Sequence, residues 1–122
     1  MKGIIVGILL LVSLDVFSAA PSCHSNPTYC QYTGKVSKIY TNNAGQILIY
    51  FDTSLNIPDA EAVGLSPSNG GAAVYPVSEN PDFARMLYST ALAAQASKRN
   101  ITIMTPSTYI GYLKIDRIWL AE

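Results

Sequence analysis

The residues of this sequence that could act as nucleophiles or bases do not form a recognisable catalytic set. A Ser-His-Asp hydrolase needs a histidine beside its nucleophile, and the only histidine, His24, is expected in an N-terminal loop next to Cys23. The segment 64–68 (GLSPS) differs by one residue from the G-x-S-x-G nucleophile elbow, and it does not follow an expected strand. These residues do not predict a hydrolase.

Carboxylates offer a second route to catalysis. Paired acids in one cleft hydrolyse glycosidic bonds, and Asp52, Asp59 and Glu61 are the acids close enough in sequence to meet. All three fall in a segment expected to be a loop, where acidic side chains are usually solvated. The sequence contains no phosphate-binding loop, dinucleotide fingerprint or metal-ligand spacing. We therefore expect a protein that is not an enzyme and that uses neither a metal nor a cofactor.

The two cysteines, Cys23 and Cys30, indicate a disulfide bond. An even pair close in sequence forms a bridge in an oxidising compartment, and this bridge would close a small loop. Free thiols are one alternative. A metal site made from Cys23, His24 and Cys30 is another, although structural zinc needs four ligands and the chain has no further cysteine or histidine.

Residues 1–20 predict a signal peptide. A short positive start precedes an almost unbroken apolar run over residues 3–14, and residues 18–20 (SAA) supply the small side chains of a cleavage site. The run is shorter than the roughly 20 residues that cross a bilayer as a helix, and nothing later resembles a membrane segment. Cleavage is expected after Ser18 or after Ala20, and the alternative to a signal peptide is a buried N-terminal helix. The protein is expected to be secreted or periplasmic, without a membrane span in its mature form.

The part of the chain after residue 20 is long enough for one domain with one modest core. It carries seven basic and seven acidic residues, so it lacks the basic surplus that usually accompanies binding to nucleic acid or anionic membranes. Charge is sparse, whereas the chain contains 8 tyrosines. Such a surface suits neutral, hydroxyl-rich or protein partners.

The mature part begins with a predicted β-hairpin. Residues 35–40 (KVSKIY) and 46–51 (QILIYF) are rich in β-branched and aromatic residues, and the turn over residues 42–45 (NNAG) joins them. Residues 52–71 contain prolines and glycines without sustained periodicity. They predict a long loop with a short helical turn around residues 58–63.

A helix is predicted over residues 81–97. Asn80 is a good N-cap, Pro81 suits the first helical position, and Asp82 favours the positive end of the helix dipole. Residues at helical spacing are expected to face the core, namely Phe83, Leu87, Thr90, Ala91 and Ala94.

Three further strands are predicted around this helix, over residues 72–77 (AAVYPV), 100–105 (NITIMT) and 112–120 (YLKIDRIWL). In the last of these the apolar residues change face, which predicts a bulge near residues 116–117. Five strands with a helix between the third and the fourth is the element order of a five-stranded OB-fold-like barrel. The predicted organisation is a signal peptide (1–20), an N-terminal segment with the cysteine pair (21–33) and a mainly β, OB-fold-like domain with one α-helix (34–122).

The aromatic residues allow two interpretations. Exposed rings can stack on sugar rings, whereas buried rings pack between strands. Both interpretations stay open for Tyr29, Tyr32, Tyr40, Tyr50, Tyr75, Tyr88, Tyr109, Tyr112 and Trp119.

Two parts of the chain resemble the subtilase-cytotoxin and pertussis-like B subunits, which are OB-fold B subunits of AB5 toxins. Residues 33–40 (TGKVSKIY) with residues 45–47 (GQI) are similar to the first hairpin of that family, S-G-x-V-x-x-x-F followed by G-Q-I. Residues 87–92 (LYSTAL), Ser97 and residues 101–103 (ITI) are similar to its helix-to-strand passage, L-Y-x-x-A-L, a small-residue turn and V-x-I. The order and spacing agree over half of the mature chain.

The resemblance implies an OB-fold subunit that assembles as a homopentamer, binds sialylated glycans and accompanies an A-type toxin subunit. In the family a serine at the start of the first strand contacts the sugar, and Thr33 takes its place here and keeps a hydroxyl. Thr105 stands where the family has a contributing tyrosine, and Tyr29 where it has an acidic residue. The internal disulfides of the family are missing. A stand-alone exported bacterial protein of the same pattern is the alternative.

The function expected from the sequence is therefore an exported, non-catalytic protein that binds sialylated or other glycans. Thr33 would offer a hydroxyl, Tyr29 and Tyr32 a stacking surface, and Thr105 a contact at the rim. The alternative is a cell-envelope structural or protein-interaction module without sugar binding. That module would use its strand edges and the loop over residues 52–71.

Overall fold

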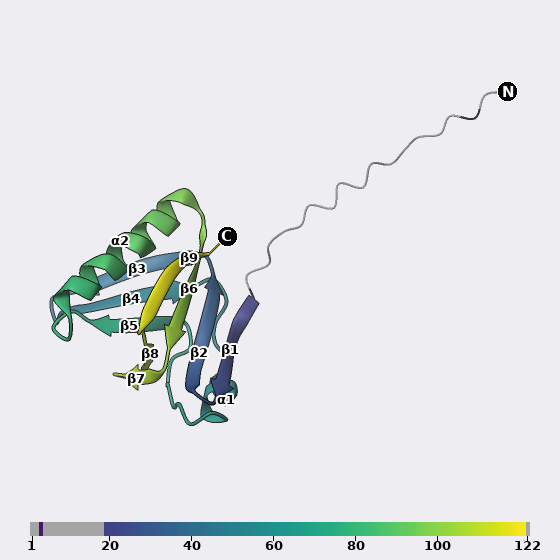
Figure 1. Ribbon diagram of the computed structural model, residues 1–122, viewed down its shortest axis with the longest axis horizontal. Helices are drawn as coiled ribbons and strands as arrows, with labels where there is room; N and C mark the ends of the chain where they lie inside the picture. The colour runs from purple at the N-terminus through teal and green to yellow at the C-terminus, as the bar shows by residue number, and fades with distance from the viewer. Residues whose placement is uncertain (1–2, 4–18, 122) are drawn as a thin grey trace.

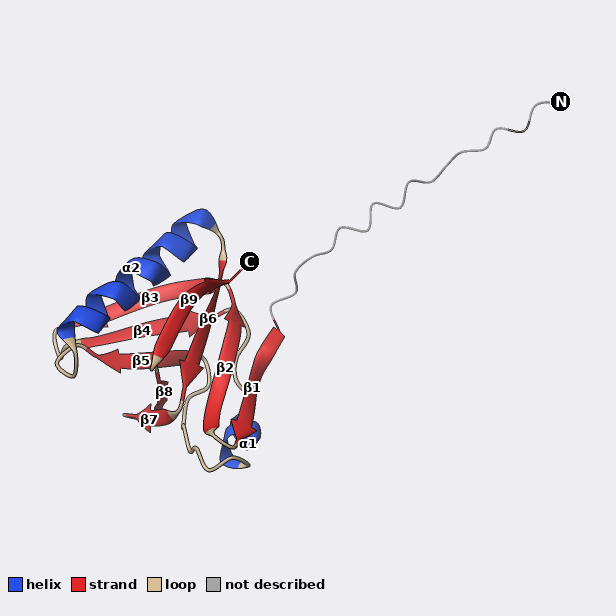
Figure 2. Cartoon of the chain, viewed as in Figure 1, coloured by secondary structure: helices blue, strands red, loops and turns tan. Residues whose placement is uncertain are grey.

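The computed structural model describes residue 3 and residues 19–121 of the chain. The predicted signal peptide, residues 1–20, lies outside the described residues apart from positions 3, 19 and 20. The described part is mainly β with one long helix, as the sequence predicts (Figure 2).

The strands form two sheets (Figure 1). The first sheet has four antiparallel strands in the order β1-β2-β6-β9, with the bounds β1 Ala19–Ser25, β2 Thr28–Gly34, β6 Asn100–Thr105 and β9 Arg117–Ala121. The second has five strands in the order β3-β4-β5-β8-β7, with the bounds β3 Val36–Asn42, β4 Gln46–Phe51, β5 Ala72–Pro76, β8 Tyr112–Lys114 and β7 Ser107–Tyr109. Only the pairing of β5 with β8 is parallel. Over residues 19–121 the structure shows two sheets and no closed barrel, in place of the predicted five-stranded barrel.

Two of the predicted strands, β4 and β6, begin and end at the expected residues. The predicted strand over residues 112–120 is divided into β8 and β9, which belong to different sheets. The backbone N–H of Ile115 donates to the Val74 carbonyl in the five-stranded sheet, whereas the next N–H, that of Asp116, donates to Met104 in the four-stranded sheet. The change of face in the sequence therefore marks a crossing between sheets, where a bulge was predicted.

The segment before residue 34 forms a hairpin that the sequence did not predict. In β1 and β2, Cys23 lies opposite Cys30 and His24 lies opposite Tyr29. β2 then pairs with β6, which follows it by about 70 positions in the chain, so that Thr33 lies opposite Thr102. The hairpin is thereby an integral part of the four-stranded sheet.

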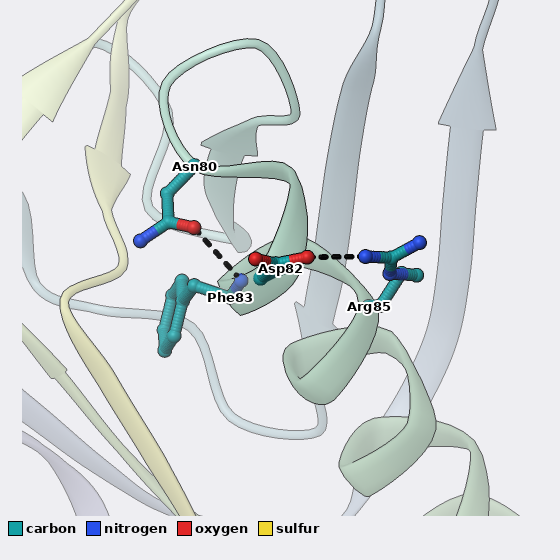
Figure 3. A network of polar contacts seen from close by, with 4 residues as sticks. All are labelled: Asn80, Asp82, Phe83 and Arg85. Carbon is teal, nitrogen blue, oxygen red and sulfur yellow. Dashed lines mark hydrogen bonds and ion pairs between the residues drawn. The ribbon is translucent and has the colours of Figure 1, made fainter.

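The long helix, α2 (Pro81–Ser97), begins and ends at the predicted residues. The side chain of Asn80 accepts a hydrogen bond of 3.1 Å from the backbone N–H of Phe83, and Asp82 in the first turn forms an ion pair with Arg85 (Figure 3). The helix ends at Lys98, whose left-handed conformation (φ 57°) stops the helical hydrogen bonding. Its buried residues are Ala84, Leu87, Ala91 and Ala94.

The main core lies between the inner faces of the two sheets, and α2 covers it. The four-stranded sheet contributes Tyr32, Ile101 and Ile103, and the five-stranded sheet contributes residues such as Ile47 and Ile49. Successive side chains of a strand point to opposite sides of the sheet, so Ile47 and Ile49 join this core while Leu48 between them joins a separate cluster on the other side. Each sheet thereby has one inner and one outer face. The small residues of α2 let the helix approach this core closely.

The loop over residues 52–71 is packed against the fold. It contains the short helix α1 (Ile57–Glu61), close to the predicted helical turn. Leu55, Ala60 and Leu65 of this loop are buried in a second apolar cluster with Cys30 and Leu113. The loop therefore covers the end of the fold at which the disulfide lies.

Substitution of Leu87 by alanine should lower the free energy of unfolding by about 2–5 kcal/mol, because it leaves a cavity where α2 meets both sheets. Leu92→Ala on the exposed flank of the same helix is the matched control, with an expected change within about 0.5 kcal/mol. Urea unfolding of both variants measures the difference. Equal losses would contradict the position of the core.

Candidate functional site

Tyr32, expected to offer a stacking surface, lies in the interior. Its ring stacks on Phe51 with 4.1 Å between the ring centroids. Its hydroxyl oxygen lies 2.6 Å from the Lys35 carbonyl oxygen and 2.6 Å from Asp52 Oδ1, and it accepts a hydrogen bond from the Asp52 backbone N–H. Burial, together with the hydrogen bond to the Asp52 side chain, raises the pKa of Tyr32 well above its usual value. The ring therefore packs the core and joins β2 to the start of the 52–71 loop.

Thr105 is also buried. Its hydroxyl donates a hydrogen bond of 2.9 Å to the carbonyl oxygen of Cys30, its partner across the ladder between β2 and β6. Tyr32 and Thr105 both lie on the inner face of the four-stranded sheet, because they have the same strand parity as Cys30 and Ile103. The structure does not bring them together with Thr33 and Tyr29 at one surface.

Thr33 and Tyr29 lie on the opposite side of the same sheet. Thr33 Oγ1 is 2.9 Å from Thr102 Oγ1 on β6, and the Tyr29 ring stacks on His24 of β1 with 4.8 Å between centroids. The ladder register places Thr102 opposite Trp119 of β9. A row therefore runs across three strands, from a hydroxyl through a second hydroxyl to an indole.

We call this side the four-stranded outer face. A second row, parallel to the first, contains Gln31, Met104 and Arg117, which are partners in the same ladders. Trp119 is 42 % exposed, and Arg117 is exposed. The complete face consists of Ser22, His24, Tyr29, Gln31, Thr33, Thr102, Met104, Arg117 and Trp119.

The chemistry of the four-stranded outer face is that of hydrogen bonding combined with one large apolar ring. The partly exposed Gln31 and Thr33 offer donors and acceptors without charge, whereas Thr102 is buried and its hydroxyl is bonded to that of Thr33. Within residues 19–121, Arg117 forms one ion pair, a 3.4 Å contact with Asp116, and both side chains are more than half exposed. An exposed pair of this kind is weak, so the guanidinium can exchange it for an anionic ligand. Within the described residues no cluster of metal ligands occurs on this or any other surface.

The outer face of the five-stranded sheet differs in chemistry. Leu48, Ala72 and Val74 are buried there beneath the partly buried rings of Tyr50 and Tyr112. Two further tyrosines, Tyr40 (46 % exposed) and Tyr109, lie on the same side, and the Lys38 ammonium is 4.1 Å from the Tyr50 ring centroid. We call this the tyrosine face. Its rings shield an apolar floor, which accounts for much of the tyrosine content.

Most residues of the four-stranded outer face were not singled out by the sequence. Trp119 was one of nine aromatic residues of undecided role, and Thr102, Gln31 and Arg117 were not among the predicted site residues. Only the pairing of β2, β6 and β9 brings them together. If β2 had been predicted as a strand paired with β6, the position of Thr102 opposite Thr33 would have followed from the register.

The disulfide between Cys23 and Cys30 is present, as predicted. It joins residues that lie opposite each other in β1 and β2 and so closes the hairpin. No helix in the described part of the chain is long and apolar enough to cross a membrane. The disulfide is compatible with a location outside the cytoplasm.

Comparison with known proteins gives no relative for this chain: no family model, no curated protein and no solved structure matches it.

The stability of the fold should fall at alkaline pH through Tyr32. The folded-state pKa of Tyr32 is raised. Its neutral form therefore makes its full contribution to the free energy of unfolding at pH values below the unfolded-state pKa of about 10. This contribution is lost as the pH rises further, since the unfolded state ionises first. Urea midpoints measured from pH 8 to pH 11.5 should therefore decline more steeply for wild type than for Tyr32→Phe. Equal slopes would contradict this role of Tyr32.

Proposed function

We propose that the chain is an exported, non-catalytic protein that binds glycans at the four-stranded outer face. The observation that carries the proposal is the exposed Trp119 in register, across the buried Thr102, with the partly exposed hydroxyl of Thr33. An aromatic ring packs on the apolar C–H face of a sugar ring, and neighbouring hydroxyl and amide groups bond to the sugar hydroxyls. The disulfide and the signal-peptide pattern support export.

The dimensions of the face favour an oligosaccharide. Neighbouring strands lie about 4.8 Å apart, so a ligand that contacts both Trp119 and Thr33 must span about 10 Å. Arg117 lies two residues before Trp119 on the same strand and points to the same side. A guanidinium binds a carboxylate through two parallel hydrogen bonds, so Arg117 supports acidic, sialylated glycans as the preferred class.

We propose further that the two sheets are a variant of the OB-fold. β2 and β3 would together be its first strand, β4 and β5 the second and third, β6 the fourth, and β8 with β9 the fifth. The position of α2 between β5 and β6, and the parallel pairing of β5 with β8, support this assignment. Other OB-folds bind ligands on their second and third strands, which here carry the tyrosine face.

Alanine at Trp119 should weaken binding of the best glycan from an array at least tenfold, because it removes the ring on which a sugar would pack. Thr33→Ala should weaken the same glycan by about threefold to tenfold, in line with the loss of one hydrogen bond. Calorimetric titration of the oxidised protein with that glycan measures both.

Tyr40→Ala is the matched control, because it removes an equally exposed ring from the other sheet. It should bind within twofold of wild type. A loss in Tyr40→Ala with none in Trp119→Ala would move the site to the tyrosine face. An array without binding above background would overturn the glycan proposal, and an unchanged affinity of Thr33→Ala would remove the hydroxyl row from it.

A second candidate function is a protein-interaction module without sugar binding. The tyrosine face is the observation that favours it, because tyrosine is enriched in protein interfaces. Tyr40 and Tyr109 are exposed there, beside the partly buried rings of Tyr50 and Tyr112. The two functions are distinguished by the glycan array, on which a module of this kind binds nothing.

We also propose that the exported chain assembles as a homopentamer, to which an A-type toxin subunit could bind. Four strands have one side without a partner strand in the described structure, namely β1, β9, β3 and β7, and open strand edges promote association. Light scattering of the oxidised protein on a sizing column should give a mass near five times that of the protomer. A monomer at every concentration would contradict the ring.

A further inference from the structure

One edge of the five-stranded sheet is open and lies beside the long helix. Within residues 19–121, β3 pairs with β4 on one side and with no strand on the other. Alternate N–H and C=O groups of its seven residues point away from β4 and are available to a further strand. α2 runs along β3, as Figure 1 shows. The open edge therefore borders a helix.

Two hollows lie beside α2, one toward each end of β3. The larger has a volume of about 420 Å³ and lies where the end of β3, the start of β4 and the segment after β5 meet the first half of α2. Its lining includes Thr41, Ile47, Val77, Ala84 and Tyr88. The smaller has about 210 Å³ and is lined by residues at the other end of both elements. The larger hollow is large enough for an apolar side chain, and its lining is mainly apolar.

The flank of α2 between the hollows exposes apolar side chains. Tyr88 is 40 % exposed and Leu92 is 45 % exposed. Residues 88, 92 and 95 lie on one side of the helix because they are four and three residues apart. Tyr88 lines the larger hollow and Gln95 the smaller one, so Leu92 lies between them. We call the two hollows, together with this flank of α2 and the edge of β3, the β3–α2 groove.

The groove is positively charged at one end. Lys35 and Lys98 both line the smaller hollow. Both are exposed, and neither takes part in an ion pair within the described part of the chain. At the other end Arg85 is occupied by Asp82 (Figure 3). A ligand carboxylate is therefore best neutralised beside Lys35 and Lys98.

We propose that the β3–α2 groove binds an extended peptide of a partner protein, which adds as a strand to the edge of β3. An apolar side chain of the peptide occupies the hollow beside Tyr88. An acidic residue, or the terminal carboxylate, lies beside Lys35 and Lys98. The hollows are separated by roughly 17 Å along β3, since a strand rises about 3.3 Å per residue, so the two anchors are four to six residues apart.

Extended backbone fits this groove better than a helix does. A docked helix has no free backbone groups along its length, and it would cover the open N–H and C=O groups of β3 without bonding to them. A strand bonds to these groups and directs alternate side chains toward α2. This inference goes beyond glycan binding, because the groove shares no residue with the four-stranded outer face.

The test is selection of peptides from a displayed library of random heptapeptides with free C-termini, using the oxidised protein as target. The enriched peptides should alternate apolar and polar residues and be acidic toward one end. Leu92→Glu should weaken the best synthetic peptide at least tenfold, and Lys98→Gln should weaken it about threefold to tenfold. Backbone N-methylation of that peptide should abolish binding at alternate positions only, because alternate N–H groups bond to β3.

Met86→Glu is the matched control, because it introduces the same charge at an exposed apolar site (61 % exposed) on the far flank of α2. It should bind within twofold of wild type. The proposal is overturned if no peptide is enriched, if the two glutamate variants bind alike, or if N-methylation has no positional effect. Loss of an oligomer in Leu92→Glu without any enriched peptide would assign the groove to contacts between copies. Trp119→Ala, which alters the four-stranded outer face and not the groove, should leave peptide binding unchanged. The peptide proposal can therefore succeed or fail independently of the glycan proposal.

Discussion

The passage of the chain from β2 into β3 is the constraint on which the rest of the structure depends. At Gly34 and Lys35 the chain leaves the four-stranded sheet and enters the five-stranded one. The Tyr32 hydroxyl holds this crossing through the Lys35 carbonyl and the Asp52 carboxylate. A β-carbon at Gly34 would lie 2.6 Å from that hydroxyl, so the close approach requires glycine. Because both sheets share this continuous length of chain, their inner faces meet in one core.

One shared core leaves each sheet with a single outer face, and the two outer faces differ in chemistry. The four-stranded outer face presents hydroxyl, amide, indole and guanidinium groups, which suit a hydroxyl-rich ligand. The tyrosine face presents rings that cover Leu48 and Val74. Where the core would open between the sheets, α2 covers it. Within residues 19–121 the edge of β3 beside this helix has no partner strand. The proposed glycan site and the proposed peptide groove thus lie on separate parts of one small framework.

The elements with strong local signals were predicted well. The Asn80 cap and the proline after it located the start of α2, and the β-branched run of residues 46–51 located β4. The hairpin of β1 and β2 was missed, since its residues are mixed in character and its stabilising partner is β6, far away in sequence. The change of apolar face near Asp116 was detected, but the pattern could not distinguish a bulge from a crossing between sheets. Local pattern does not report which strand lies next to which.

The sequence by itself determined the mainly β character, the limits of α2 and the pairing of the only two cysteines, because each depends on neighbours in the chain. Tertiary structure alone decided that Tyr32 packs inside while the adjacent Thr33 faces outward. Successive side chains of a strand point to opposite sides of the sheet. Of two adjacent candidate site residues, one is therefore exposed and the other buried, and which is which depends on the side of the sheet that packs against the core. The same pairing placed Trp119 beside Thr102 and Thr33. The candidate site therefore exists only through contacts between strands that are far apart in the chain.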